Sequence, residues 1–301
     1  MSAREKRDLP ASIRQRLLNL SRERNMAFDL VLVRYGIERL LYRLTCSEHS
    51  DAFLLKGAML FAVWSPQTHR PTRDLDLLGF GHTELKDIEG IFKELCEQPI
   101  LDDGLAFLSA SVEVAYIREE ARYGGVRVSM MAKLGNARIP LQVDIGYGDA
   151  VTPGPEKVTF PSLLALHAPI LRAYPIYTVV AEKFEALVSL SATNTRMKDF
   201  FDLWFLSENF DFEANVLSQA IRATFDRRGT ALLASDEIVG LSDAFAADRK
   251  AVWDSFLIRN GLGRRELREI LDRLKRFLLP MVHAEKANKS ALWKAGLGWD
   301  S

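Results

Sequence analysis

The stretch RPTRDLDLL, residues 70–78, predicts a short strand with two acids on one face. Residues two apart on a strand point the same way, so Asp74 and Asp76 share one face while Leu75 and Leu77 point into the core. Two carboxylates this close repel each other unless a cation lies between them, and Mg²⁺ binds carboxylates together with phosphate oxygens. We therefore expect Asp74 and Asp76 to hold a divalent metal. The alternative is an exposed strand end without a function.

A second predicted strand, PLQVDIG at residues 140–146, carries a third acid. Its aliphatic residues alternate with polar ones, and Asp144 lies in mid-strand, where an acid is disfavoured unless it has a partner or a purpose. Beside the strand of Asp74 and Asp76, Asp144 would complete a three-carboxylate site of the two-metal type that serves nucleotidyl transfer. A lone Asp that faces solvent is the alternative.

The stretch LKGAM, residues 55–59, is expected near the start of a helix that runs from Phe53 to Trp64. A glycine near a helix N-terminus lets the backbone approach a triphosphate, whose charge the free N–H groups and the helix dipole favour. We expect Gly57 and Ala58 to contact the phosphates and Lys56 to add a charge. A glycine needed only for packing is the alternative.

Two stretches of the C-terminal half place charges among apolar residues. Lys183 lies on a mainly apolar predicted helix and is therefore expected to face a cleft. In RMKDFFDLW, residues 196–204, Asp199 and Asp202 lie among aromatic residues, and charges in such surroundings need partners. We expect a nucleotide phosphate near Lys198, Asp199 and Asp202. The alternative is a Lys198–Asp202 surface pair, worth about 0.3–0.5 kcal/mol.

The order of the predicted elements gives an α+β fold with two parts, residues 1–150 and 151–301. Strands are expected at 73–78, 111–117, 126–133 and 139–147, and helices of the first part at 11–24, 28–45, 53–64 and 83–97. After a Pro/Gly cluster at 152–155, helices are expected at 161–167, 176–192, 197–208, 213–226, 241–258 and 264–279. The tail from His283 is expected to be loose, apart from Trp293 and Trp299.

Composition limits the classes of protein. The chain has 301 residues, of which 48% are hydrophobic and 27% charged, and its net charge of zero argues against a general nucleic-acid coat protein. The N-terminus lacks the apolar segment of a secretory signal, and the longest apolar run, residues 53–64, is too short for a bilayer span. The two cysteines, Cys46 and Cys96, fit a reducing compartment. We therefore expect a cytoplasmic protein without a membrane partner.

Other chemistries lack their motifs. The five histidines show no metal-ligand spacing, and neither a Walker A loop nor a Gly-x-Ser-x-Gly motif is present. Two basic segments could hold a polyanionic acceptor, although solvated helix faces are the alternative for each. Their residues are Arg4, Lys6, Arg7, Arg14, Arg16, Arg22 and Arg24 near the start, and Arg264, Arg265, Arg268, Arg273, Lys275 and Arg276 near the end.

Taken together, these stretches closely resemble the AbiEii-type nucleotidyltransferase toxins of type IV toxin–antitoxin systems. The resemblance covers roughly residues 28–206 and is carried by YGIERLLYRL (35–44), LKGAM (55–59), RPTRDLD (70–76), QVDIG (142–146), AEKFEA (181–186) and RMKDFFDL (196–203). It implies a polymerase-β-like nucleotidyltransferase core, with a mixed sheet flanked by helices, followed by an all-helical C-terminal part. One departure is Ala58, where the wider superfamily often has a serine that contacts the triphosphate.

The resemblance also implies a function. It assigns Asp74 and Asp76 to metal binding, Asp144 to the looser third position and Lys183 to the incoming nucleotide, with Mg²⁺ or Mn²⁺ as the cofactor. It implies a toxin that moves a pyrimidine nucleotide from an NTP to an RNA acceptor, most simply the 3′ end of tRNA, in a phage-defence module with an antitoxin encoded nearby. Modification of a protein, kinase-like transfer of the γ-phosphate and a non-catalytic nucleotide- or RNA-binding module are the alternatives.

Overall fold

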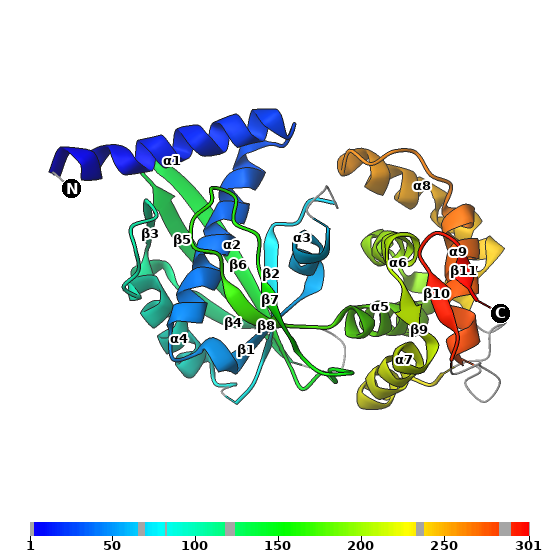
Figure 1. The fold of residues 1–301 in the computed structure, drawn as a ribbon. Helices are drawn as coiled ribbons and strands as arrows, with labels where there is room; N and C mark the ends of the chain where they lie inside the picture. The colour runs from blue at the N-terminus through cyan, green and yellow to red at the C-terminus, as the bar shows by residue number, and fades with distance from the viewer. Residues whose placement is uncertain are drawn as a thin grey trace. The chain divides into compact units, whose positions relative to one another are not determined.

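The computed structural model describes residues 3–65, 70–81, 83–117, 124–232, 238–282 and 290–300 (Figure 1). The chain forms two compact units. The first contains Met1–Gly148 and Glu156–Ala173, and the second contains Asp149–Pro155 and Tyr174–Ser301. The parts expected from the sequence, 1–150 and 151–301, are continuous stretches, whereas the compact units are not, because residues 156–173 return to the first unit.

The first unit is built on a mixed sheet, as the sequence predicts. The strands follow the order β3 (Leu105–Phe107), β5 (Gly125–Leu134), β6 (Ala137–Tyr147), β2 (Asp74–Gly79), β1 (Phe53–Lys56), β8 (Ile170–Ala173) and β7 (Glu156–Thr159), with β4 (Glu113–Ile117) paired to β5. The β2–β6 and β1–β8 pairs are parallel, and the other pairs are antiparallel. The three short strands β3, β7 and β8 are absent from the sequence prediction.

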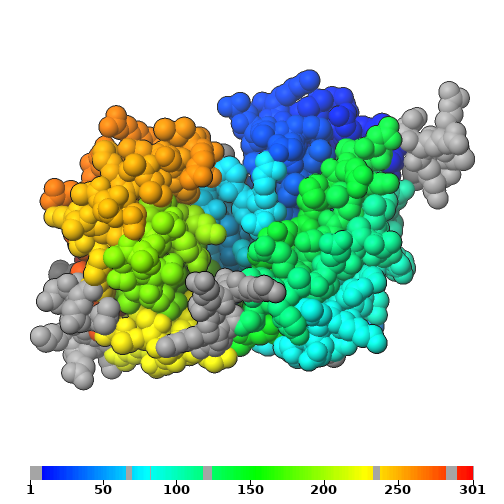
Figure 2. Space-filling view, turned by 180° about the vertical axis from the view of Figure 1, so that it is seen from behind, coloured from blue at the N-terminus to red at the C-terminus, as the bar shows by residue number. Residues whose placement is uncertain are grey.

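Helices α1 (Ala3–Glu23), α2 (Phe28–Cys46) and α4 (Leu85–Glu97) pack on this sheet (Figure 1). The short helix α3 (Leu60–Trp64) follows the turn after β1. Helix α2 comes close to β6 at Gly36, where an added Cβ would lie 3.0 Å from a Leu141 methyl and 3.4 Å from Ile139 Cγ2. Leu141 and Ile139 therefore belong to the helix-covered face, and the residues that alternate with them along β6 belong to the other face. Seen from behind, the residues around β5 and β6, drawn in green, form a broad part of the surface (Figure 2).

The expected helix from Phe53 to Trp64 is wrong in its first half. Residues Phe53–Lys56 form β1, Gly57–Met59 form a 3₁₀ turn, and only Leu60–Trp64 are α-helical. A short apolar run fits a buried strand as well as a buried helix, and here Phe53, like the two leucines after it, is buried in the sheet.

The expected helix at 161–167 is also wrong. This segment has no helical structure, because buried side chains of α2 bind its backbone. Glu38 Oε2 accepts a hydrogen bond from the Leu163 N–H at 2.8 Å, and Arg39 Nη1 donates to the His167 carbonyl at 2.8 Å. Ala165 lies at a φ of 55°, which also interrupts a right-handed helix.

The second unit is mainly helical, as expected. Its helices are α5 (Ile176–Leu190), α6 (Met197–Asn209), α7 (Ala214–Arg228), α8 (Asp243–Arg259) and α9 (Leu267–Val282). No helix in the described ranges is long and apolar enough to cross a membrane.

The C-terminal tail is ordered where it was expected to be loose. Strands β10 (Leu292–Lys294) and β11 (Gly298–Trp299) form a small antiparallel sheet with β9 (Phe212–Glu213). Trp293 is 1% exposed, and its indole N–H donates to the Ser207 carbonyl at 2.7 Å. Residues 283–289, where the loose tail was expected to begin, lie outside the described residues.

Candidate active site

The three acids predicted from the sequence lie together on the sheet of the first unit. In the parallel β2–β6 pair, Asp76 lies opposite Asp144, and Asp74 lies opposite Gln142. Residues opposite each other on neighbouring strands share a face, so Asp74, Asp76 and Asp144 point to the same side. Leu75 points to the other side and is 1% exposed.

This carboxylate face is the side of the sheet away from α2. Gly36 of α2 packs on Leu141, which alternates with Gln142 along β6. Asp74 is exposed, whereas Asp76 and Asp144 are half-buried. The carboxylate face therefore presents one exposed and two partly exposed acids.

The turn after β1 touches the same group of acids. Lys56 lies opposite Asp76 in the antiparallel β1–β2 pair, so both residues share the carboxylate face. Gly57 has a φ of +72°, and a Cβ at this position would lie 2.7 Å from Cβ and Cγ of Asp76, and closer still to its Oδ2. Glycine is therefore required both by its backbone conformation and by the approach of Asp76.

Gly57 and Ala58 begin a short helical segment, because the 3₁₀ turn Gly57–Met59 runs directly into α3, which has five residues. Their contact with the phosphates stays a prediction, and the missing side chain of Gly57 allows the close approach that it needs.

Arg127 is a member of this face that the sequence analysis missed. On β5 it lies opposite Asp144, and its Nε and Nη2 donate to Asp144 Oδ1 and Oδ2, each at 2.8 Å. These hydrogen bonds to Asp144 raise the pKa of the Arg127 guanidinium. The alternation of buried Val126, Val128 and Met130 with polar residues along β5 was the available signal.

In the second unit, Lys183 joins the two acids of α6. Lys183 Nζ lies 2.8 Å from Asp199 Oδ1 and 2.7 Å from Asp202 Oδ2, and Arg196 Nε lies 2.7 Å from Asp199 Oδ2. Asp199 and Asp202 are 1% and 0% exposed. Burial alone would raise the pKa of Asp199, but Lys183 and Arg196 outweigh it and hold this pKa below its usual range.

Lys198 lies apart from this ion-pair cluster. Its side chain is exposed, and the described residues include no carboxylate paired with it. The Lys198–Asp202 surface pair that the spacing allowed is wrong, because Asp202 is buried and its carboxylate binds Lys183.

The residue before Lys183 belongs to a second buried cluster. Glu182 and Asp149 each lie 3.1 Å from Arg228 Nη2, while Glu185 lies 2.8 Å from Nη1. Tyr174, which is fully buried, donates to Glu182 at 3.2 Å. These contacts join the start of the second unit to α5 and α7, so we interpret the cluster as structural.

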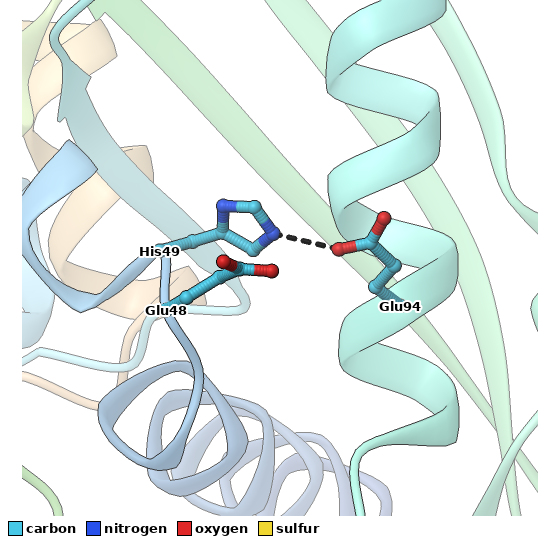
Figure 3. A group of neighbouring side chains, drawn as sticks. All are labelled: Glu48, His49 and Glu94. Carbon is cyan, nitrogen blue, oxygen red and sulfur yellow. Dashed lines mark hydrogen bonds and ion pairs between the residues drawn. The ribbon is translucent and has the colours of Figure 1, made fainter.

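One further group of side chains could hold a metal ion. Glu48, His49 and Glu94 each offer a ligand atom within 4.8 Å of the others, and His49 Nε2 lies 2.8 Å from Glu94 Oε2 (Figure 3). The sequence spacing of the histidines could not show this group, because Glu94 comes from α4. The group follows α2, near the Phe53–Gly79 end of the β1–β2 pair, whereas Asp76 and Lys56 lie at the opposite end. It is therefore separate from the carboxylate face.

Two solved structures are similar in part. JHP933 from Helicobacter pylori is 16% identical, with 84% of this chain and 92% of that chain covered at a TM-score of 0.46. A protein named provisionally as a nucleotidyltransferase from H. pylori is 17% identical, with coverages of 82% and 91% and a TM-score of 0.43. Because both TM-scores are below 0.5, these likenesses carry no argument here. No curated protein matches this chain in sequence.

The family model described as "Nucleotidyl transferase AbiEii toxin, Type IV TA system" matches residues 39–282. This range contains both strands of the carboxylate face and both helices of the Lys183 cluster. The chain is therefore a nucleotidyltransferase, and it belongs to the AbiEii toxin family of type IV toxin–antitoxin systems.

Proposed function

We propose that this enzyme moves a pyrimidine nucleotide from an NTP to the 3′ end of a tRNA, with Mg²⁺ or Mn²⁺ bound by Asp74, Asp76 and Asp144. The observation that carries the proposal is the β2–β6 register, which sets Asp76 beside Asp144 and leaves Asp74 on the same open face. When an acceptor attacks the α-phosphate and pyrophosphate leaves, negative charge develops on the attacked and departing oxygens. Metal ions held by carboxylates stabilise such charge in phosphoryl and nucleotidyl transfer.

The residues present fit a hard divalent cation. All three acids offer oxygen ligands, and the absence of a side chain at Gly57 lets the Asp76 carboxylate lie against the turn after β1. When bound, the metal would polarise the phosphate and favour loss of the acceptor proton. The Glu48–His49–Glu94 group lies elsewhere and is not part of this proposal.

The chain's own residues would then have separate roles. Asp144 would accept the proton of the acceptor hydroxyl, since no histidine lies on the carboxylate strands. Lys56, beside Gly57 and Ala58, would add positive charge for the triphosphate. In the second unit, the exposed Lys198 would contact the nucleotide, while the buried Asp199 and Asp202 hold Lys183 in place.

An RNA acceptor agrees with part of the basic surface. Arg264 and Arg268 are exposed, although each also pairs with an acid, Glu266 and Asp243 respectively. Arg273 does not belong to such a surface, because it is 5% exposed and donates to the Ser207 carbonyl. Near the start of the chain, the structure does not describe the side chains of Arg4, Lys6 and Arg7.

The family assignment gives the enzyme an NTP substrate and an antitoxin partner. We further propose that the antitoxin is encoded beside the toxin and that the pair serves phage defence. A protein acceptor and a kinase-like reaction remain separate outcomes of the same experiment. The non-catalytic alternative is excluded by the assignment to an enzyme family.

The test incubates the protein with each NTP, labelled at either the α- or the γ-phosphate, and with tRNA, total RNA or cell protein. We expect α-label from a pyrimidine NTP on tRNA, only in the presence of Mg²⁺ or Mn²⁺, and none with the Asp76→Asn variant. Label on protein would show a protein acceptor instead of tRNA. Transfer of the γ-label would show a kinase-like reaction instead of nucleotidyl transfer. Full activity of Asp76→Asn with metal still required would contradict the metal assignment.

A further inference from the structure

Arg127 binds both carboxylate oxygens of Asp144, the third acid of the proposed metal site. Its Nε and Nη2 bind Asp144 Oδ1 and Oδ2 at 2.8 Å, the parallel two-bond geometry that makes arginine–carboxylate pairs strong. The Arg127 and Asp144 side chains are 44% and 22% exposed, so the pair is open to solvent and to ions.

The pair belongs to a row of charges across four strands. The row runs Arg127 on β5, Asp144 on β6, Asp76 on β2 and Lys56 on β1, each opposite the next. Within this row Arg127 contacts Asp144 directly, whereas Asp76 and Lys56 lie one and two strands further on.

Gln142 gives Arg127 a second acceptor on the same face. With its amide oriented to satisfy its neighbours, the Gln142 carbonyl oxygen lies 3.3 Å from both Nε and Nη2 of Arg127. Arg127 can thus keep an acceptor while one or both oxygens of Asp144 turn toward another cation.

We propose that Arg127 is the resident counter-cation of the carboxylate face and a positioning residue for Asp144. Metal and guanidinium compete for Asp144, so this acid joins the metal only as Arg127 moves toward Gln142. Asp74 and Asp76 are then the permanent ligands, and Asp144 is the switchable one. The inference rests on the proposed metal site.

The competition predicts the direction of a metal-binding change. An exposed ion pair changes an equilibrium constant by up to about fivefold. Removing the guanidinium should therefore tighten metal binding by up to about fivefold. This tightening should require Asp144.

The experiment measures Mn²⁺ binding by electron paramagnetic resonance, without nucleotide, in the full-length protein. Arg127→Gln should bind Mn²⁺ up to about fivefold more tightly than the wild type, and Arg127→Lys should fall between them because lysine keeps the charge without the two parallel bonds. Lys133→Gln is the matched control. It removes a positive charge from the same strand and face, six residues or about 20 Å away, and should change nothing. In an Asp144→Asn background, Arg127→Gln should have no effect.

Each other outcome overturns the inference. Unchanged or weaker Mn²⁺ binding by a folded Arg127→Gln variant would show that the guanidinium supports the site instead of competing for it. Tighter binding that persists with Asp144→Asn, or that Lys133→Gln reproduces, would reduce the effect to general charge. Absence of binding by both the wild type and Arg127→Gln would also refute it. The proposed metal site fails separately, if Asp76→Asn binds Mn²⁺ as the wild type does.

Discussion

Replacing Gly57 with alanine should damage the carboxylate face more than the rest of the fold. The backbone at Gly57 has a φ of +72°, a conformation that costs an L-residue about 1–2 kcal/mol. The added Cβ would also lie 2.7 Å from two carbons of Asp76, so this side chain must move away from its present position. We expect Gly57→Ala to lower the melting temperature by about 2–8 °C, from about 2–4 °C per kcal/mol for domains of this size.

Activity should fall further than stability. Because Asp76 is a proposed metal ligand that the new methyl group displaces, nucleotide transfer at a temperature where the variant is folded should drop by at least about tenfold. Thermal unfolding and transfer of α-label are measured on the same preparations.

Gly90→Ala is the matched control for this substitution. Gly90 lies inside α4, and no atom lies within 4 Å of a Cβ added there. Alanine should stabilise this helix by about 0.4–1 kcal/mol and leave activity unchanged. Normal activity and stability of Gly57→Ala would refute both the strain and the Asp76 displacement.

Three further predictions concern charges away from that turn. Lys183→Met should destabilise the protein by about 3–5 kcal/mol in urea unfolding, because Asp199 and Asp202 stay buried without their cation; a variant as stable as the wild type would contradict this. Because Lys183 and Arg196 hold the pKa of Asp199 below its usual range, the stability from this carboxylate is present above about pH 4 and lost as the pH falls through the lowered value. Urea midpoints between pH 6 and pH 2 should therefore fall less steeply for Asp199→Asn than for the wild type, and parallel curves would exclude the effect. His49→Ala should keep metal-dependent transfer and change stability by no more than about 0.5 kcal/mol. Loss of transfer in this variant would instead assign the catalytic metal to the Glu48–His49–Glu94 group in Figure 3.

The long elements of the fold were predictable because their patterns are long. Strands β5 and β6 and the helices α5 to α9 carry enough periodic residues to identify both their type and their approximate ends. Segments of two to four residues, such as β8 and β10, lack a period of their own. They form only because partners distant in sequence pair with them, as Leu55 does with Ala173.

Within the site, strand alternation predicted which acids share a face but not what else reaches them. Asp74 and Asp76 are two apart, so their common direction follows from the sequence alone. The pairing of Arg127 with Asp144 depends on the β5–β6 register, and an arginine in an alternating strand has an ordinary solvent-facing explanation. The ion pairs of Lys183 were likewise not predictable from its own helix, because its two acids lie on the next helix, 16 and 19 residues away. The sequence therefore predicted only that Lys183 faces a cleft.

The two groups of acids differ in burial and in how their negative charge is balanced. Asp74, Asp76 and Asp144 are three acids on an open face, where a metal can add charge. Asp199 and Asp202 are buried and already balanced by Lys183 and Arg196.

A metal therefore suits the first group and has no place in the second. A nucleotide phosphate at Lys183 would add negative charge to a group that is already neutral. The extra positive charge must come from a neighbour outside this balance, and the exposed Lys198 is such a residue, whereas Arg196 is already paired with Asp199. If the second unit binds the triphosphate, Lys198 should determine its affinity, whereas Lys183 should determine whether the binding surface is folded.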